Sequence, residues 1–127
     1  MAGFATKLYV DVLDDGLYKL TAPLVYYSDI LAKEIESPED RETDFASVPR
    51  VPIVYWFYGN RAHHESAIHD ELYRSGIVTR RTADRIFLEA MKSRGKGLFV
   101  RWGMYLGVRL GGWIAWRKYR AAEKNIS

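Results

Sequence analysis

The sequence predicts an α+β fold, with an N-terminal antiparallel β-sheet followed by a helical half of about three helices. Two observations predict this class. β-forming residues alternate with polar residues early in the chain, and apolar residues recur at helical spacing after residue 65. The length of 127 residues predicts a single domain, with residues 1–50 mainly strands and loops and residues 60–122 mainly α-helical.

The predicted strands lie in the first 35 residues of the chain. Residues 7–13 alternate apolar and polar side chains, and Asp14-Asp15-Gly16 is a hairpin turn signal that leads into the next strand. Residues 24–27 continue the pattern after Pro23, which has no amide hydrogen for a strand ladder and marks an edge or a break. Residues 30–35 are a further short strand, followed by a polar loop.

The predicted helices follow a proline-rich and aromatic stretch. The first runs from about residue 65 to residue 74 and stops at Gly76. Thr79 or Thr82 caps the second helix, and a third spans about residues 98–122. The second helix has a core face at spacing i, i+3, i+4, i+7, i+8, formed by Ala83, Ile86, Phe87, Ala90 and Met91.

The composition excludes several classes of site and partner. The chain has no cysteine, so it has no disulfide and no thiolate metal site. We do not expect nucleic-acid binding, because the net charge of +3 is too small to indicate it. No run of about 18 uncharged apolar residues is present, and we expect neither a membrane span nor a signal peptide.

A group of catalytic residue types lies on the first two helices. His69 and Tyr73 are four residues apart and share one helix face, whereas Asp70 points about 100° away, where it could address a metal ion. Asp84 shares its helix with apolar residues that face inward. If the helices are antiparallel, Asp84 accepts a hydrogen bond from one ring nitrogen of His69, which leaves the other nitrogen to take a proton from water. Tyr73 would hold Asp84 through its hydroxyl.

A purely structural interpretation of the same residues stays open. A helical histidine such as His69 is more often a packed residue than a catalyst. Asp70 and Arg74 have the i, i+4 spacing of an ordinary surface ion pair. Asp44 and Ser47, in the segment before the helices, have the side chains that make turn hydrogen bonds. Taken together, these residues predict a site of some kind and leave its activity open.

Three motifs carry a resemblance to a known group of proteins. They are TDFASVP at residues 43–49, AIHDELY at residues 67–73 and ADRIF at residues 83–87. In this order they resemble a family of short uncharacterised proteins encoded by bacteriophages and prophages. The resemblance implies a phage-encoded protein that acts in the host cytoplasm or the virion, and it implies no settled function.

The helix pair is also similar to the calcium-dependent phospholipase A2 superfamily, over about residues 59 to 90. By that likeness His69 would be the base, Asp70 a calcium ligand, and Tyr73 and Asp84 the support for the histidine. The resemblance implies calcium as cofactor and a phospholipid-like ester as substrate.

This chain departs from that superfamily in its calcium loop. The superfamily places a glycine-rich loop before the helix, and this chain offers only Gly59-Asn60 there. Calcium takes six to eight oxygen ligands, and Asp70 supplies at most two. We therefore consider Asp44 as an additional oxygen ligand.

The predicted C-terminal helix has an unusual distribution of side chains. Gly103, Gly107 and Gly111 recur every four residues and would allow another helix to approach closely. The other side carries aromatic and basic residues: Arg101, Trp102, Tyr105, Arg109, Trp113, Trp116 and Arg117. We expect at least two of its aromatic rings to stay exposed and to bind a partner, either another phage protein or a lipid headgroup layer. Packing of both sides inside the domain is the alternative.

Two functions follow from these observations. The first is a metal-assisted hydrolase of a phospholipid-like ester, with His69 as base, Asp70 and Asp44 as metal ligands, and Tyr73 and Asp84 as supports. The second is a non-enzymatic virion component, associated with tail or capsid, in which the motif residues hold the helix pair together and the C-terminal helix docks a partner.

Overall fold

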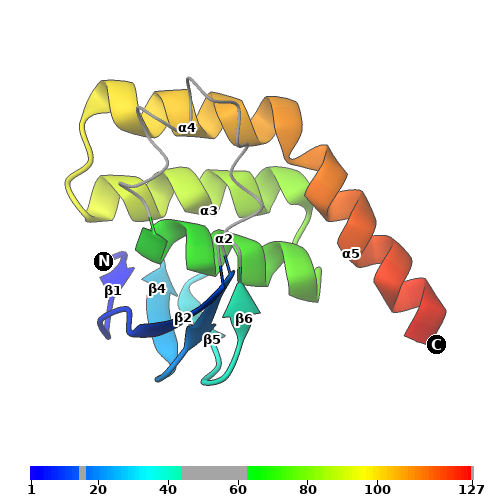
Figure 1. Ribbon diagram of the computed structural model, residues 1–127. Coiled ribbons are helices and arrows are strands. Elements are labelled where there is room, and N and C mark those ends of the chain that lie inside the picture. The colour runs from blue at the N-terminus through cyan, green and yellow to red at the C-terminus, as the bar shows by residue number, and fades with distance from the viewer. Residues whose placement is uncertain (15–16, 44–62, 127) are drawn as a thin grey trace.

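The computed structural model describes residues 1–14, 17–43 and 63–126. It has the predicted α+β class, with the strands gathered at one end of the molecule and the helices stacked beside them (Figure 1). Of the sequence-predicted site residues, Asp44 lies outside the described residues.

Six strands in the described residues form two antiparallel sheets. They are β1 (Gly3–Phe4), β2 (Val10–Asp14), β3 (Leu17–Leu20), β4 (Leu24–Ser28), β5 (Lys33–Ser37) and β6 (Glu42–Thr43). One sheet has the order β1-β4-β5 and the other β2-β3-β6. The predicted hairpin is present, since Val10 pairs with Leu20 across β2 and β3.

We predicted one N-terminal antiparallel sheet, whereas the described strands form two. The chain leaves the β2-β3-β6 sheet after Leu20 and at Leu24 returns to the sheet that already holds β1. Pro23 lies in this interval and has no amide hydrogen to donate, so a continuous ladder is interrupted there. The last predicted strand also begins later than expected, at Lys33, because the chain first turns through Ala32 with φ of 54°.

Four helices follow in the described residues: α2 (His63–Ser75), α3 (Arg80–Ser93), α4 (Leu98–Gly111) and α5 (Trp113–Ile126). The predicted third helix is thus two helices. They meet at Gly111 and Gly112, and the path changes direction there (Figure 1). Adjacent glycines favour such a bend because they lack the side chains that stiffen a helix.

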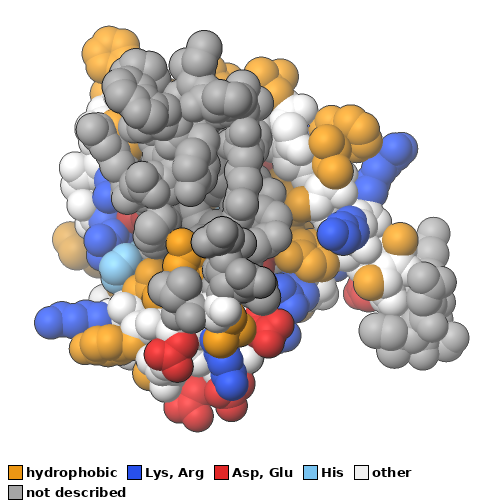
Figure 2. Space-filling view, viewed as in Figure 1, with side chains coloured by type: hydrophobic (Ala, Val, Ile, Leu, Met, Phe, Trp, Pro, Cys, Tyr) orange, Lys and Arg blue, Asp and Glu red, His pale blue; other side chains and the backbone are white. Residues whose placement is uncertain are grey.

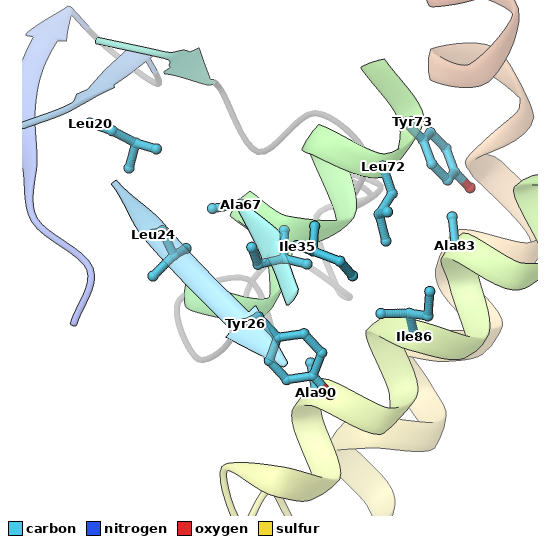
Figure 3. Close-up of a cluster of buried hydrophobic side chains, with 11 residues drawn as sticks. Leu20, Leu24, Tyr26, Ile35, Ala67, Leu72, Tyr73, Ala83, Ile86 and Ala90 are labelled. Carbon is cyan, nitrogen blue, oxygen red and sulfur yellow. The ribbon is translucent and has the colours of Figure 1, made fainter. Parts of the chain in front are cut away.

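The core lies between the β1-β4-β5 sheet and the first two helices. β4 and β5 contribute Leu24, Tyr26 and Ile35, and Leu20 joins them from β3 of the other sheet. α2 and α3 pack residues from one face of each helix against these side chains (Figure 3). A second cluster joins α3 to α4 through Phe87, Met91, Met104 and Val108. The predicted core face of α3 is confirmed, since all five of its residues are buried.

Candidate active site

A short turn brings α2 and α3 side by side as neighbours. Gly76 ends α2 with a positive φ of 64°, which glycine adopts without strain, and its amide donates to the Leu72 carbonyl. Thr79 then caps α3 by accepting a hydrogen bond from the Thr82 amide. The sequence predicted the stop at Gly76 and a cap at either Thr79 or Thr82. They place the middle of α2 opposite the first turns of α3.

His69 and Asp84 meet across this helix pair. Nε2 of His69 lies 2.6 Å from Oδ1 of Asp84, and both side chains are fully buried. The contact that the motif spacing predicts is therefore present. Tyr73, one turn after His69, donates its hydroxyl hydrogen to the same Oδ1 at 2.6 Å.

The second oxygen of Asp84 is held by α4. Arg109 Nη1 donates to Oδ2 at 2.7 Å, and Arg80 Nη1 lies 3.6 Å from the same atom. Arg80 also donates to the carbonyl oxygens of Val108 and Arg109, which ties α3 to the end of α4. The carboxylate thus joins three helices, with a donor on each of its oxygens.

These contacts determine the protonation of Asp84. Burial alone would raise the pKa of Asp84, but the hydrogen bonds from His69, Tyr73 and Arg109 lower it overall. Burial and the neighbouring carboxylate raise the pKa of Tyr73, which keeps its hydroxyl protonated. An ionised carboxylate only accepts hydrogen bonds, so His69 carries a proton on Nε2.

The other ring nitrogen of His69 is the chemically interesting atom. Nδ1 is buried and has no hydrogen-bond partner within the part of the chain that the structure describes. The rings of Tyr73 and Phe87 pack against the imidazole, with centroids at 4.2 and 4.8 Å, and hold its orientation. A neutral His69 with Nε2 protonated therefore presents a lone pair on Nδ1.

Sequence reasoning assigned Arg109 to a partner surface and did not consider Arg80. Arg109 instead follows the buried Val108 directly, so its guanidinium reaches inward to Asp84. Arg80 could have been found from its i, i+4 spacing to Asp84. Arg109 lies 25 residues from Asp84, and no local pattern connects the two.

Asp70 has a different set of neighbours from the one that calcium needs. Its Oδ1 accepts the Tyr119 hydroxyl hydrogen at 2.6 Å, and its Oδ2 lies 3.4 Å from Arg74 Nη2. A calcium ligand must offer its oxygens to the ion. The Asp70 oxygens instead face two hydrogen-bond donors, one of them cationic, so Asp70 does not fit that role. The described residues also bring together no group of three or more His, Asp or Glu that could hold a metal ion. We derive no step through calcium.

The aromatic residues of α4 and α5 divide into two groups. Trp102 and Trp113 are 45% and 47% exposed, so two rings are exposed, as we expected. Trp116 instead packs against the core, and its ring meets the Tyr73 ring edge-on at 5.3 Å. Tyr105 is half-buried and contacts the Trp102 ring. Trp116 thus supports the buried pair from outside.

A family model described as "Protein of unknown function (DUF1353)" matches residues 18–108, which is most of the chain. The chain belongs to this family. No curated protein and no solved structure matches the chain.

The DUF1353 region contains most of the site but not all of it. His69, Tyr73 and Asp84 lie inside the match, whereas Arg109 and Tyr119 lie beyond its end. The buried pair of His69 and Asp84 therefore lies in the matched region, and the α5 residue that contacts Asp70 lies outside it. Among the described helices, none combines the length and the apolar composition that crossing a bilayer requires.

Proposed function

We propose that this DUF1353 protein is a hydrolase in which Nδ1 of His69 takes a proton from the water that attacks an ester. One observation carries the proposal. Nε2 of His69 is bound to Asp84, while Nδ1 has no partner in the described residues. This is the arrangement of a general base and the group that orients it.

The reaction uses this chain's residues in two steps. Water attacks the ester carbonyl carbon while Nδ1 accepts its proton, and Asp84 stabilises the resulting imidazolium. The tetrahedral intermediate then expels the alkoxide, which takes the proton from Nδ1, so an acid and an alcohol leave and His69 is neutral again. Tyr73 and Arg109 act as positioning residues, because they hold the Asp84 carboxylate.

We infer that the substrate is a phospholipid-like ester, because the sequence of the helix pair resembles that of phospholipases A2. The order of the three sequence motifs supports coding by a phage or prophage, and action in the host cytoplasm or the virion. The exposed rings of Trp102 and Trp113 support a partner there, either another phage protein or a lipid surface.

The test is hydrolysis of an ester panel by the purified chain. The panel holds nitrophenyl esters of short and long acids and a fluorogenic phospholipid. His69→Gln should lower any rate about a hundred- to ten-thousand-fold and leave the fold largely intact. His64→Gln is a matched control, because its amide can still accept the hydrogen bond that Leu8 donates to His64. Equal rates for the two variants would refute the role of His69 as the general base.

The second candidate is a non-enzymatic virion component, associated with tail or capsid. Complete burial of His69, Tyr73 and Asp84 favours it, because a buried network that joins α2, α3 and α4 also serves to hold a fold together. In that case no ester in the panel is hydrolysed. His69→Gln would then lower the free energy of unfolding, while His64→Gln would change it less.

A further inference from the structure

The outer face of α4 carries a row of large apolar side chains that nothing in the described chain covers. We call it the apolar ridge, and it continues into the first turn of α5. Its residues are Leu98, Phe99, Trp102, Leu106, Leu110, Trp113 and Ile114, all of which are exposed. The exposed fraction reaches 87% at Phe99 and 79% at Leu110. Figure 2 shows hydrophobic side chains along this edge of the molecule.

The ridge lies opposite the face by which α4 joins the core. Leu106 is two residues from both Met104 and Val108, which places it about 200° around the helix from each of them. Met104 and Val108 are buried against α3. A helix of a water-exposed domain normally has polar residues on the far side. Here both sides are apolar, and a contiguous exposed patch of this kind marks an interaction surface.

The charged residues of α4 do not interrupt the ridge. Arg109 points inward to Asp84, and Arg101 donates to the Lys96 carbonyl at the start of the helix. Basic residues gather instead at the α5 end. Arg117 lies over the exposed Trp113 ring, 5.3 Å from its centroid, and Lys118 beside it is exposed.

Charge decides which occupant fits the ridge. Residues 98–126 hold six Lys or Arg and a single acidic residue, Glu123. Arg117 and Lys118 are the exposed ones among the described side chains of this set, and a two-fold contact between two copies along the ridge would bring these cations of both copies together, which is unfavourable. The exposed cations require an anionic occupant, and the uncharged ridge requires one with an apolar interior.

The shape of the ridge favours a bilayer over a protein groove. α4 is the outermost helix on the side away from the strands (Figure 1). Its 14 residues span roughly 21 Å and would lie along a surface. Trp102 and Trp113 stand near the two ends of the ridge, and tryptophan prefers the boundary between headgroups and acyl chains.

We propose that the apolar ridge docks this protein on an anionic lipid bilayer. α4 lies in the headgroup layer with Phe99, Leu106 and Leu110 toward the acyl chains, and Arg117 and Lys118 bind lipid phosphates. Docking does not depend on hydrolysis, since the ridge residues touch neither His69 nor Asp84 among the contacts of the described residues.

The experiment measures binding of the full chain to vesicles by co-sedimentation and by tryptophan emission. Vesicles of phosphatidylcholine alone are compared with vesicles that hold about one-third phosphatidylglycerol. We expect association with the anionic vesicles, a blue shift of the emission, and weakening by salt. Leu106→Ser should lower the partition coefficient about tenfold or more. Replacing both Arg117 and Lys118 by Gln should lower it roughly tenfold or more.

Ile77→Ser is the matched control, because Ile77 in the α2–α3 turn is 59% exposed and Leu106 is 56% exposed. This variant should bind as the unaltered chain does. His69→Gln should also bind normally, which separates docking from hydrolysis. The proposal is overturned if anionic vesicles bind no protein, or if Ile77→Ser and Leu106→Ser weaken binding equally. Self-association that Leu106→Ser abolishes, without vesicle binding, would assign the ridge to a second copy instead.

Discussion

Gly112 lies directly against the hydroxyl of Tyr73. A Cβ placed on Gly112 would be 2.5 Å from the Tyr73 oxygen, closer than real Cβ atoms approach a neighbour. The bend between α4 and α5 passes over the buried pair of His69 and Asp84. It can do so only if position 112 has no side chain. The same oxygen donates the hydrogen bond to Asp84, so the bend and the site share one packing constraint.

Gly112→Ala should lower the free energy of unfolding by about 1–3 kcal/mol, because it overpacks this contact. Urea unfolding followed by circular dichroism measures the change. Gly3→Ala is the control, since a Cβ at Gly3 meets nothing within 4 Å. Equal stabilities for the two variants would show that the bend can move away from Tyr73.

The Asp84 carboxylate should make stability depend on acid. Its folded-state pKa is lowered, so its contribution is fully present above the unfolded value of about 4. That contribution is lost as the pH falls through the lower folded value. Removing a cationic partner with Arg109→Gln should move this loss toward higher pH. Urea titrations over the acid range measure it, with exposed Arg85→Gln as control. An unchanged acid profile in Arg109→Gln would contradict the assignment.

The hydroxyl of Tyr119 should hold α5 on α2. It donates to Asp70, while Arg120 donates to the carbonyl oxygens of Tyr73 and Arg74 at the end of α2. Tyr119→Phe removes one hydrogen bond to a charged group and should cost about 1.5–3 kcal/mol. Tyr105→Phe, on the half-buried side of α4, should cost less. Hydrogen exchange of α5 amides reports the same change locally, and a rate that stays the same in Tyr119→Phe would exclude this role.

Calcium should not raise the thermal stability of this chain. A ligand that binds only the folded state raises the melting temperature, and the oxygens of Asp70 already face Tyr119 and Arg74. The measurement is the melting temperature with and without millimolar calcium, with magnesium as control. A rise in melting temperature that is specific to calcium and absent in Asp70→Asn would contradict this prediction and show that Asp70 binds calcium.

The parts of the fold that were predicted depend on local signals. Gly76 ends one helix and Thr79 starts the next because their backbone and side-chain chemistry acts within four residues. The alternation of apolar residues likewise predicted the β2–β3 hairpin. Division of the strands into two sheets depends on pairing between distant segments, as in Glu42 beside Lys19, which no local pattern contains.

The site divides in the same way. His69, Tyr73 and Asp84 were predicted because helical spacing and one short turn determine their geometry. Arg109 and Tyr119 were not, because they reach Asp84 and Asp70 from 25 and 49 residues away. The placement of Tyr119 also depends on the bend at Gly112, where a single long helix was expected.

Catalysis by His69 requires an unprotonated Nδ1, and the state of the ring can be measured directly. Selective ¹⁵N labelling of histidine and long-range proton–nitrogen correlation distinguish the two tautomers and the charged ring, and His69→Gln identifies the signals. In spectra recorded near pH 7 we expect His69 to carry its hydrogen on Nε2 and a lone pair on Nδ1. A hydrogen on Nδ1 at that pH would contradict the role of His69 as the general base. The atom that is assigned to accept a proton from water would then already carry one.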